Sequence, residues 1–200
     1  MTESHVYLLS SASGEMVAAS LFDDVKDEHL LLWHDSWAPA MRAHRTNRPL
    51  GNSPEDSHWN WKQKAESWRK LLGFQSYALV CEGGLQGMMV TNTIKSARLP
   101  QQFGKPLLYI DFVATAPWNR PELNSPPRFR GTGRVFILAA IQASIDEGYK
   151  GRVGLHSLPK AETFYEKKCG FTRLGPDSSH QNLTYYEMTE TQAEFFCQCH

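Results

Sequence analysis

The feature that most constrains this fold is a pair of glycines between a proline-rich segment and an apolar helix. The stretch RFRGTG (128–133) follows PWNRPELNSPP (117–127) and precedes RVFILAAIQASIDE (134–147). The last segment is apolar on every side, which is typical of a helix covered by a sheet and by other helices. Gly148 is expected to end it. The pattern therefore predicts a layered domain with a buried helix.

Short apolar segments on both sides of that helix are typical of strands. YALVCE (77–82) and QGMMVTNTI (86–94) flank two glycines and predict a hairpin. PLLYIDFVATA (106–116) is almost continuously apolar and predicts a central strand. Further strands are expected at 6–11, 151–158, 171–175 and 183–189. With helices between them, the strands predict an α/β protein with a mixed sheet and helices on its faces.

The N-terminal third predicts two helices. EHLLLWHDSWA (28–38) has helical spacing, and Pro39 is expected to limit it. A polar loop follows at 46–58, and a second helix is expected at about 54–72. A short helix is also expected at 160–169.

The start of the second helix has its own pattern. Ser53 is a candidate N-cap, Pro54 suits the first helical position, and Asp56 stands three residues after the cap. Apolar residues then recur at helical spacing up to Leu72, and Gly73 is expected to stop the helix.

Composition excludes several classes of protein. Lys plus Arg and Asp plus Glu are 21 each among 200 residues, so the formal net charge is zero, which argues against a dedicated nucleic-acid binder. No apolar run approaches 18 residues, so no membrane span is expected. The length predicts a single domain over 1–200. The N-terminus has no secretory pattern and the four cysteines form no disulfide framework, so we expect reduced thiols and a cytoplasmic protein.

RFRGTG has three competing interpretations from its residues alone. A dinucleotide fingerprint would need a glycine at position 136, which is Phe136, and no P-loop pattern occurs in the chain. A flexible turn before a helix is the plainest alternative. A phosphate cradle is the third, because unpaired amides at a helix N-terminus attract anions and glycines permit close approach. Arg128, Arg130 and Arg134 would add charge-assisted hydrogen bonds.

Two motifs together resemble the GNAT acetyltransferase superfamily. Arg128-Phe129-Arg130-Gly131-Thr132-Gly133 resembles its R-x-x-G-x-G acyl-CoA motif, and AETFYEKKCGF (161–171) resembles its later A-x-x-x-Y-x-x-x-G-F segment. The resemblance covers about 75–189 and implies a GNAT-like fold with a mostly antiparallel central sheet flanked by helices. Residues 1–74 would then form the acceptor side. The loop 117–127 is longer than usual in the family, and Leu158 replaces a common asparagine.

The resemblance implies acetyl-CoA as cofactor and an amine as acceptor. Tyr165 matches the family's general acid, which protonates the departing thiolate. Main-chain groups of one strand would pair with the pantetheine arm and polarise the thioester carbonyl. The cofactor-binding residues implied are Val113, Ala114, Thr115, Arg128, Phe129, Arg130, Gly131, Thr132, Gly133 and Arg134.

The general base stays open at this point. Asp111 is the only carboxylate in its strand, and a hydrogen-bonded structural role is the alternative. Glu82, His156 and a chain of waters are further candidates. A covalent route through Cys169 lacks a supporting His or Asp. Cys197, Cys199 and His200 could ligate a metal only as an incomplete set, with an exposed tail as the alternative.

The acceptor itself is not readable from the sequence. It would be a primary amine of a small molecule or of a protein, with no nucleic acid or membrane involved; a homodimer stays open. The N-terminal region holds five of the six tryptophans, and MRAHRTNR (41–48) is basic. We expect the loop 117–127 to be stiff and extended because of its prolines, and to border the cleft. Two alternatives remain: a GNAT-fold module that binds acyl-CoA without catalysis, and an unrelated α/β domain.

Overall fold

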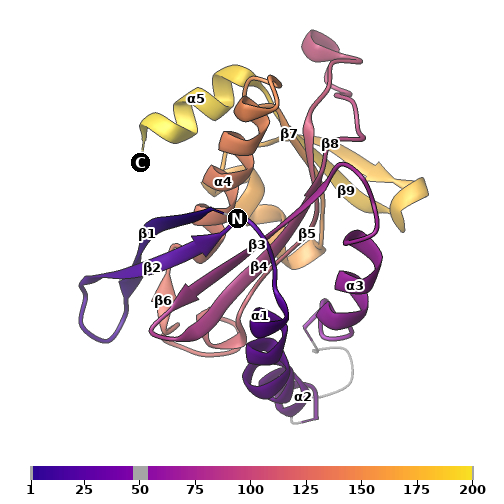
Figure 1. The fold of residues 1–200 in the computed structure, drawn as a ribbon. Coiled ribbons are helices and arrows are strands. Elements are labelled where there is room, and N and C mark those ends of the chain that lie inside the picture. The colour runs from indigo at the N-terminus through magenta and orange to yellow at the C-terminus, as the bar shows by residue number, and fades with distance from the viewer. Residues whose placement is uncertain (1, 47–53, 200) are drawn as a thin grey trace. The chain divides into compact units, whose positions relative to one another are not determined.

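The computed structural model describes residues 2–46 and 54–199 (Figure 1). The chain divides into two compact units. One unit comprises Met1–Met89 and Val113–Val135, and the other comprises Val90–Phe112 and Phe136–His200. Three elements run from one unit into the other: β4 (Gly84–Asn92), β5 (Leu108–Thr115) and α4 (Thr132–Asp146).

The described strands follow the order β6-β1-β2-β3-β4-β5-β7-β9-β8. Among the pairs whose register is given, β5 and β7 are parallel and the others are antiparallel. This confirms the expected mixed sheet with mostly antiparallel pairing, flanked by helices.

The first unit is built on an antiparallel meander. It contains β1 (Glu3–Ser10), β2 (Met16–Phe22), β3 (Phe74–Cys81), most of β4, and the short β6 (Phe129–Arg130). The predicted strand at 6–11 and the predicted hairpin are confirmed, whereas β2 was not predicted. Glu82 and Gly83 form the hairpin turn with φ values of 50° and 70°, the left-handed pair that a tight two-residue turn requires.

The first predicted helix does not stop at Pro39. α1 (Asp27–Leu32) continues through a π-helical turn (Trp33–Trp37) into α2 (Ala38–Thr46). The amide of Ala38 donates to the carbonyl of Trp33, five residues back. This wider turn precedes Pro39 and makes room for its pyrrolidine ring, which would otherwise clash with the preceding turn of the helix. The prediction that Pro39 limits the helix was therefore wrong.

The second predicted helix begins later and ends earlier than expected. α3 spans Trp61–Trp68, and Oδ1 of its N-cap Asn60 accepts from the amide of Gln63 at 3.1 Å. Ser53, the predicted cap, lies outside the described residues, and Pro54 and Asp56 precede the helix. Because the helix ends at Trp68, Leu72 leaves the apolar stripe and is 95% exposed.

The second unit contains the rest of β5 with β7 (Val153–Ser157), β8 (Thr172–Asp177) and β9 (Leu183–Met188). Most of α4 belongs to it. Phe136, Ile137, Ala140 and Ile141 are buried, whereas Leu138 and Ala139 are half-buried and Ile145 is 48% exposed, so α4 is covered on one face and not on all sides as predicted. α5 (Glu190–Gln198) was not predicted, because an incomplete metal site or an exposed tail was expected around Cys197 and Cys199. Its N-cap Thr189 and Gln192 form a capping box.

Short turns of 3-10 and π helix connect these elements. Pro159–Ala161 is a 3-10 turn and Phe164–Lys168 is a π-helical turn, where one continuous helix at 160–169 was expected. The remaining 3-10 turns are Pro100–Gln102, Pro117–Asn119 and Ser178–His180.

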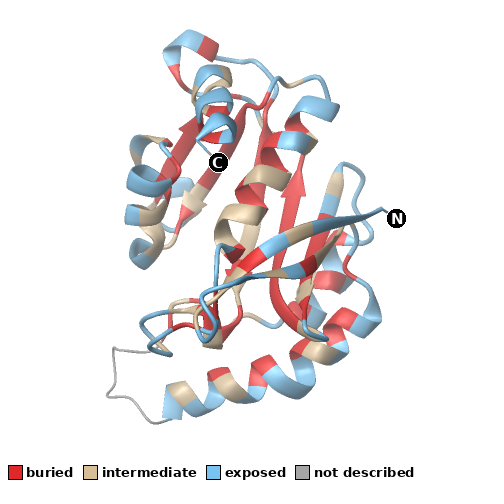
Figure 2. Cartoon of the chain, turned by 90° about the vertical axis from the view of Figure 1, so that its left-hand side faces the viewer, coloured by how far each residue is buried: buried red, intermediate tan, exposed pale blue. Residues whose placement is uncertain are grey.

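The strands carry the most continuous runs of buried residues (Figure 2). Every residue of β4 after Gly84 is buried, and so is every residue of β9 after Leu183. No helix within residues 2–46 and 54–199 has the length and apolar character needed to cross a membrane.

Candidate cofactor and catalytic site

The RFRGTG stretch forms a strand, a glycine turn and the first turn of a helix. β6 pairs with β1, and Arg130 lies opposite Leu9. Gly131 then takes a φ of +100°, a conformation that favours glycine. α4 begins at the next residue, and the amide of Val135 donates to the carbonyl of Gly131 at 3.0 Å. The amides of residues 132 and 133 therefore have no acceptor within the helix.

The side chains of this stretch divide into buried and outward-facing groups. Phe129 and Thr132 are buried, so they can offer a ligand only their main-chain groups. Gly131 and Arg130 are exposed, and Arg134 is half-buried. Arg128 is already engaged, because its Nη2 donates to Oε2 of Glu82 at 2.7 Å in a half-exposed ion pair.

A buried glutamine holds the loop that leads into this stretch. Oε1 of Gln86 accepts from the indole of Trp118 and from Nδ2 of Asn119, each at 2.9 Å. Asn119 in turn uses Oδ1 to accept from the amide of Phe129 at 3.0 Å. Gln86 is fully buried, so these hydrogen bonds are shielded from water. Side chains thereby fix the loop between β5 and β6 to Gln86 of β4.

The loop 117–127 turns back on itself, so the prediction that it is extended was wrong. The amides of Leu123 and Asn124 both donate to the carbonyl of Arg120. Nδ2 of Asn124 bridges the carbonyls of Trp118 and Pro126 at 3.2 and 3.0 Å. Prolines preset φ for the early positions of turns as readily as for extended chain, so they do not distinguish the two.

The strand predicted to hold the pantetheine arm is the last part of β5. Its ladder with β7 ends at the pair Ile110 and Leu155, and β5 continues to Thr115. Val113 and Thr115 are half-buried, whereas Ala114 is buried. The carbonyl of Thr115 accepts from Nε of Arg120 at 2.7 Å.

Asp111 lies on the same strand, and its carboxylate has a hydrogen-bond partner. Oδ2 of Asp111 accepts from Nδ2 of the buried Asn92 at 2.5 Å, and Oδ1 of Asn92 accepts from the amide of Ile94 at 3.0 Å. A carboxylate fixed in this way is suited to anchoring a positive group.

Tyr165 lies on the π-helical turn after β7, in an aromatic cluster. Its ring is 5.8 Å from that of Phe171 and 6.3 Å from that of Tyr186. The residue is 7% exposed. Burial raises the pKa of its phenol well above the ordinary value, so Tyr165 stays protonated over the physiological range.

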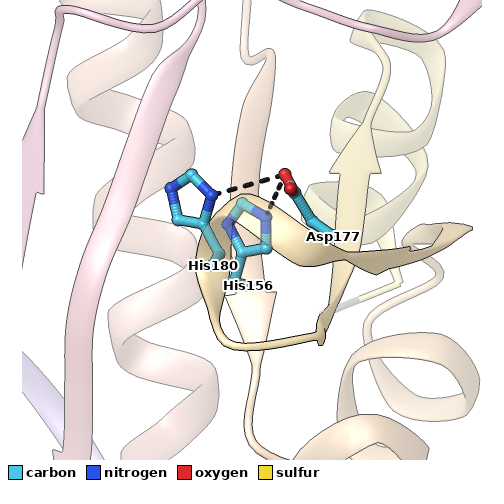
Figure 3. Close-up of side chains that lie close together, drawn as sticks. All are labelled: His156, Asp177 and His180. Atoms are coloured by element: carbon cyan, nitrogen blue, oxygen red, sulfur yellow. Dashed lines mark hydrogen bonds and ion pairs between the residues drawn. The ribbon is translucent and has the colours of Figure 1, made fainter.

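A hydrogen-bonded cluster surrounds His156, and no sequence pattern predicted it (Figure 3). Nδ1 of His156 meets the hydroxyl of Tyr109 at 2.5 Å, and Nε2 meets Oδ2 of Asp177 at 3.0 Å. His180 stacks on the His156 ring with centroids 3.9 Å apart. Tyr109 and Asp177 lie 47 and 21 residues from His156, a spacing that no local pattern reveals.

Hydrogen bonds also fix the charge state of this cluster. Donors from Ser179 and from the Arg98 guanidinium hold the pKa of Asp177 well below its usual range. Burial lowers the pKa of His156, although the hydrogen bond to Asp177 opposes this. The imidazole is therefore neutral and the carboxylate charged near neutral pH.

His156, Asp177 and His180 offer ligand atoms within 4.8 Å of one another, which raises the question of a metal. The shared ligand would be Oδ2 of Asp177, but that oxygen accepts from Nη1 of Arg98 at 2.6 Å. A guanidinium at that oxygen repels a cation, so we interpret the cluster as a hydrogen-bonded group.

The cysteines offer no clear chemistry. Cys169 is buried, which argues against a reactive nucleophile. Cys197 and Cys199 are exposed at the end of α5, and His200 lies outside the described residues.

A cavity of about 230 Å³ lies among the N-terminal helices of the first unit. Its apolar lining includes Trp33, Trp37 and Trp61, and Arg42 and Arg45 supply positive charge. The three tryptophans are buried, and the rings of Trp37 and Trp61 are 6.4 Å apart. Asp56 also lines the cavity, where it pairs with Arg120.

No protein-family model and no curated protein matches this sequence. Solved structures do match the fold. The GNAT domain of S. lividans PAT aligns over 93% of this chain and 96% of its own, with a TM-score of 0.53 at 13% identity. The chain has the GNAT fold. The Thermoplasma acidophilum paia N-acetyltransferase, solved with coenzyme A, gives a TM-score of 0.54 at 14% identity over 86% and 98% of the two chains.

The GNAT fold is also shared by an enzyme that makes a different product. FeeM, an N-acyl amino acid synthase from uncultured soil microbes, aligns with a TM-score of 0.53 at 13% identity over 86% of this chain and 90% of its own. At these identities the likeness shows the fold alone, and the chemistry must be argued from this chain's residues.

Proposed function

We propose that this protein transfers an acetyl group from acetyl-CoA to a primary amine of a small molecule or protein. The observation that carries the proposal is the start of α4, where an exposed glycine with a φ of +100° precedes a helix whose first amides lack helical acceptors. A helix N-terminus of this kind binds phosphate groups.

The pyrophosphate would be held by main-chain amides of residues 131–134. Arg130 is exposed beside them and would add a charge-assisted hydrogen bond, as would Arg134. Arg128 would contribute only by sharing its guanidinium with Glu82. The side chains of Phe129 and Thr132 are buried, so these two residues would meet the ligand through their main chain.

The pantetheine arm would pair with the backbone of Val113, Ala114 and Thr115. The end of the β5–β7 ladder at Ile110 supports this, because β5 continues past its last partner in β7. A ligand amide chain can add to such a backbone as an extra strand does. An amide of this segment would stabilise the negative charge that develops on the thioester oxygen.

Tyr165 would act as the general acid. When bound, acetyl-CoA supplies the thioester, and the phenol of Tyr165 would give its proton to the departing sulfur. The raised pKa keeps the phenol protonated, and therefore able to donate, over the physiological range. Asp111 would bind the positively charged amine while Asn92 holds its carboxylate in place.

The tryptophan cavity is the candidate acceptor pocket. Its volume of about 230 Å³ suits a small flat group, and tryptophan rings favour an apolar or aromatic one. Arg42 and Arg45 would favour an acceptor that also carries a carboxylate. An aromatic amino acid combines all three properties, so phenylalanine is the first acceptor to try.

The test is thermal unfolding with and without millimolar CoA, followed by a transfer assay. A ligand at 100 times its dissociation constant stabilises a fold by about 2.7 kcal/mol, which raises Tm by roughly 2–4 °C for a chain of this size. Acetyl-CoA with phenylalanine, kanamycin and a lysine peptide then tests transfer. Absence of any CoA shift would refute the proposal, and a shift without transfer would favour a non-catalytic acyl-CoA module.

A further inference from the structure

We propose that Tyr109, His156 and Asp177 form a proton relay that deprotonates the acceptor amine. This inference rests on the proposed acetyltransferase function and supplies the base that the sequence left open. The three side chains come from β5, β7 and the end of β8, all in the second unit, and Figure 3 shows His156 and Asp177 among them.

The direction of the relay follows from the donors and acceptors. An ionised Asp177 can only accept, so Nε2 of His156 carries the hydrogen at 3.0 Å. In a neutral imidazole the other nitrogen is then an acceptor. Nδ1 therefore accepts from the hydroxyl of Tyr109 at 2.5 Å. This is the carboxylate–imidazole–hydroxyl order found in hydrolase triads, here with a phenol at the end.

Tyr109 is suited to passing a proton on and poorly suited to ionising alone. Burial and the charge of Asp111 raise its pKa well above the ordinary value, so a phenolate is disfavoured. The hydroxyl can accept a proton from an amine only if it gives its own to His156 in the same step. Lys95 lies over the Tyr109 ring at 5.7 Å, so a positive charge is tolerated on this side.

Other charged groups around His156 determine where it titrates. Asp177 favours the imidazolium, whereas His180 and Arg98 disfavour it. On the β9 side, the ring of Tyr185 lies 4.9 Å away, and its hydroxyl donates to Glu187.

The sheet places the relay opposite the proposed acid. His156 is the register partner of Tyr185 and contacts its ring, whereas Tyr165 contacts the ring of Tyr186. Successive residues of a strand point to opposite faces. The relay and Tyr165 therefore lie on opposite faces of the sheet of the second unit. Tyr109 and Asp111 share one face of β5, where alternate residues are about 7 Å apart along the strand, so an amine held at Asp111 would lie on the same face as Tyr109.

The proton balance is complete without any further reagent. An N–H bond of the ammonium breaks as Tyr109 gains that proton, and the former Tyr109 proton moves to Nδ1 of His156. Asp177 stabilises the resulting imidazolium, which later loses its proton to solvent. The amine then forms its bond to the carbonyl carbon, the carbon–sulfur bond breaks, and Tyr165 protonates the sulfur. The second proton lost by nitrogen restores Tyr165.

The test compares pH profiles of kcat/KM for wild type, Tyr109→Phe and His156→Gln. The assay uses acetyl-CoA with whichever of phenylalanine, kanamycin or the lysine peptide wild type acetylates. We expect each variant to lose about 100-fold, the range of general acid–base catalysis, and the double variant to lose no more. Wild-type activity should fall in acid as His156 protonates, at a pH below the ordinary histidine pKa because burial lowers the pKa of this imidazole, and this limb should be absent in His156→Gln.

His180→Gln is the matched control. It removes a group that lowers the pKa of His156, so the acid limb should move to higher pH while the plateau is kept. This variant decides the question if His156→Gln does not fold. Retained CoA-induced Tm shifts show that the variants keep the cofactor site.

Three outcomes would overturn the relay. If Tyr109→Phe is fully active and the acid limb of its pH profile is unchanged, the relay is refuted and the acetyltransferase proposal stands. If wild type binds no CoA, or acetylates none of the amines, both the relay and the acetyltransferase function are refuted. Activity lost in EDTA and restored by Zn²⁺ would assign the His156 cluster to a metal instead.

Discussion

Asp56 and Arg120 form a bidentate ion pair that links a turn near the N-terminal helices to the loop after β5. The two oxygens of Asp56 accept from Nη1 and Nη2 of Arg120 at 2.7 and 2.6 Å, and the two side chains are 9% and 10% exposed. Nε of the same guanidinium donates to the carbonyl of Thr115. The candidate acceptor pocket and the proposed cofactor strand therefore share one arginine.

Asp56→Asn is expected to cost about 3 kcal/mol of folding free energy, because it leaves a largely buried guanidinium without its counter-ion. Denaturant unfolding measures this. Asp27→Asn is the control, since Asp27 pairs with Arg69 in an exposed bridge and should cost less than about 1 kcal/mol. Equal losses of folding free energy in the two variants would contradict the burial of the Asp56–Arg120 pair.

The two glycines of the cradle should respond differently to alanine. A Cβ on Gly131 would meet Leu8 Cδ2 at an ordinary 3.8 Å, so the cost comes from φ alone and is roughly 1–2 kcal/mol. Gly133 lies inside α4, where alanine is favoured over glycine by roughly 0.5–1 kcal/mol. Denaturant unfolding should show that Gly131→Ala is less stable than wild type and that Gly133→Ala is at least as stable.

The affinity for CoA distinguishes a phosphate-binding glycine loop from a turn that binds no ligand. Gly133→Ala should fold at least as well as wild type and yet bind CoA at least about tenfold more weakly, since its Cβ would crowd a phosphate at the helix start. Calorimetric titration with CoA measures this. Unchanged affinity would mean that no phosphate approaches Gly133.

Tyr165→Phe should lower kcat by about 100-fold or more while leaving the dissociation constant for CoA unchanged. Because the pKa of Tyr165 is raised, the acid stays protonated, and wild-type activity should show no alkaline loss from this group below pH 10. Tyr186→Phe, at the neighbouring ring, is the control and should retain kcat. Wild-type kcat in Tyr165→Phe would exclude the phenol as acid.

His29 should make folding stability depend on pH. It is 2% exposed, its Nδ1 accepts from the amide of Lys26 at 3.0 Å, and burial lowers its pKa. The pKa of histidine in the unfolded chain is about 6.5. Just below that pH the unfolded chain binds a proton at His29, whereas the folded chain does not. Stability is therefore full above that pH and is lost as pH falls through the folded pKa.

His29→Gln should flatten this dependence, because glutamine at the third helical position can accept from the cap amide without titrating. Unfolding free energies at pH 5 and pH 7.5 measure the difference. The same loss in both proteins would assign the effect to other groups.

The sequence determined the elements whose physics is local. The Gly83 hairpin turn, the uniformly apolar α4 and the glycine before it follow from backbone sterics and hydrophobic patterning, and these also carried the GNAT resemblance. Two local predictions failed: the N-cap of α3 is Asn60, and a π-helical turn lets the helix continue past Pro39.

Only the tertiary structure brought together the Asp56–Arg120 pair and the Tyr109–His156–Asp177 cluster. Their members lie 64, 47 and 21 residues apart, and each contact depends on strand register or loop path. A titratable residue has no periodicity that marks its partner. The sequence could therefore indicate where a phosphate would bind, whereas the groups that could move protons became visible only when the strands were paired.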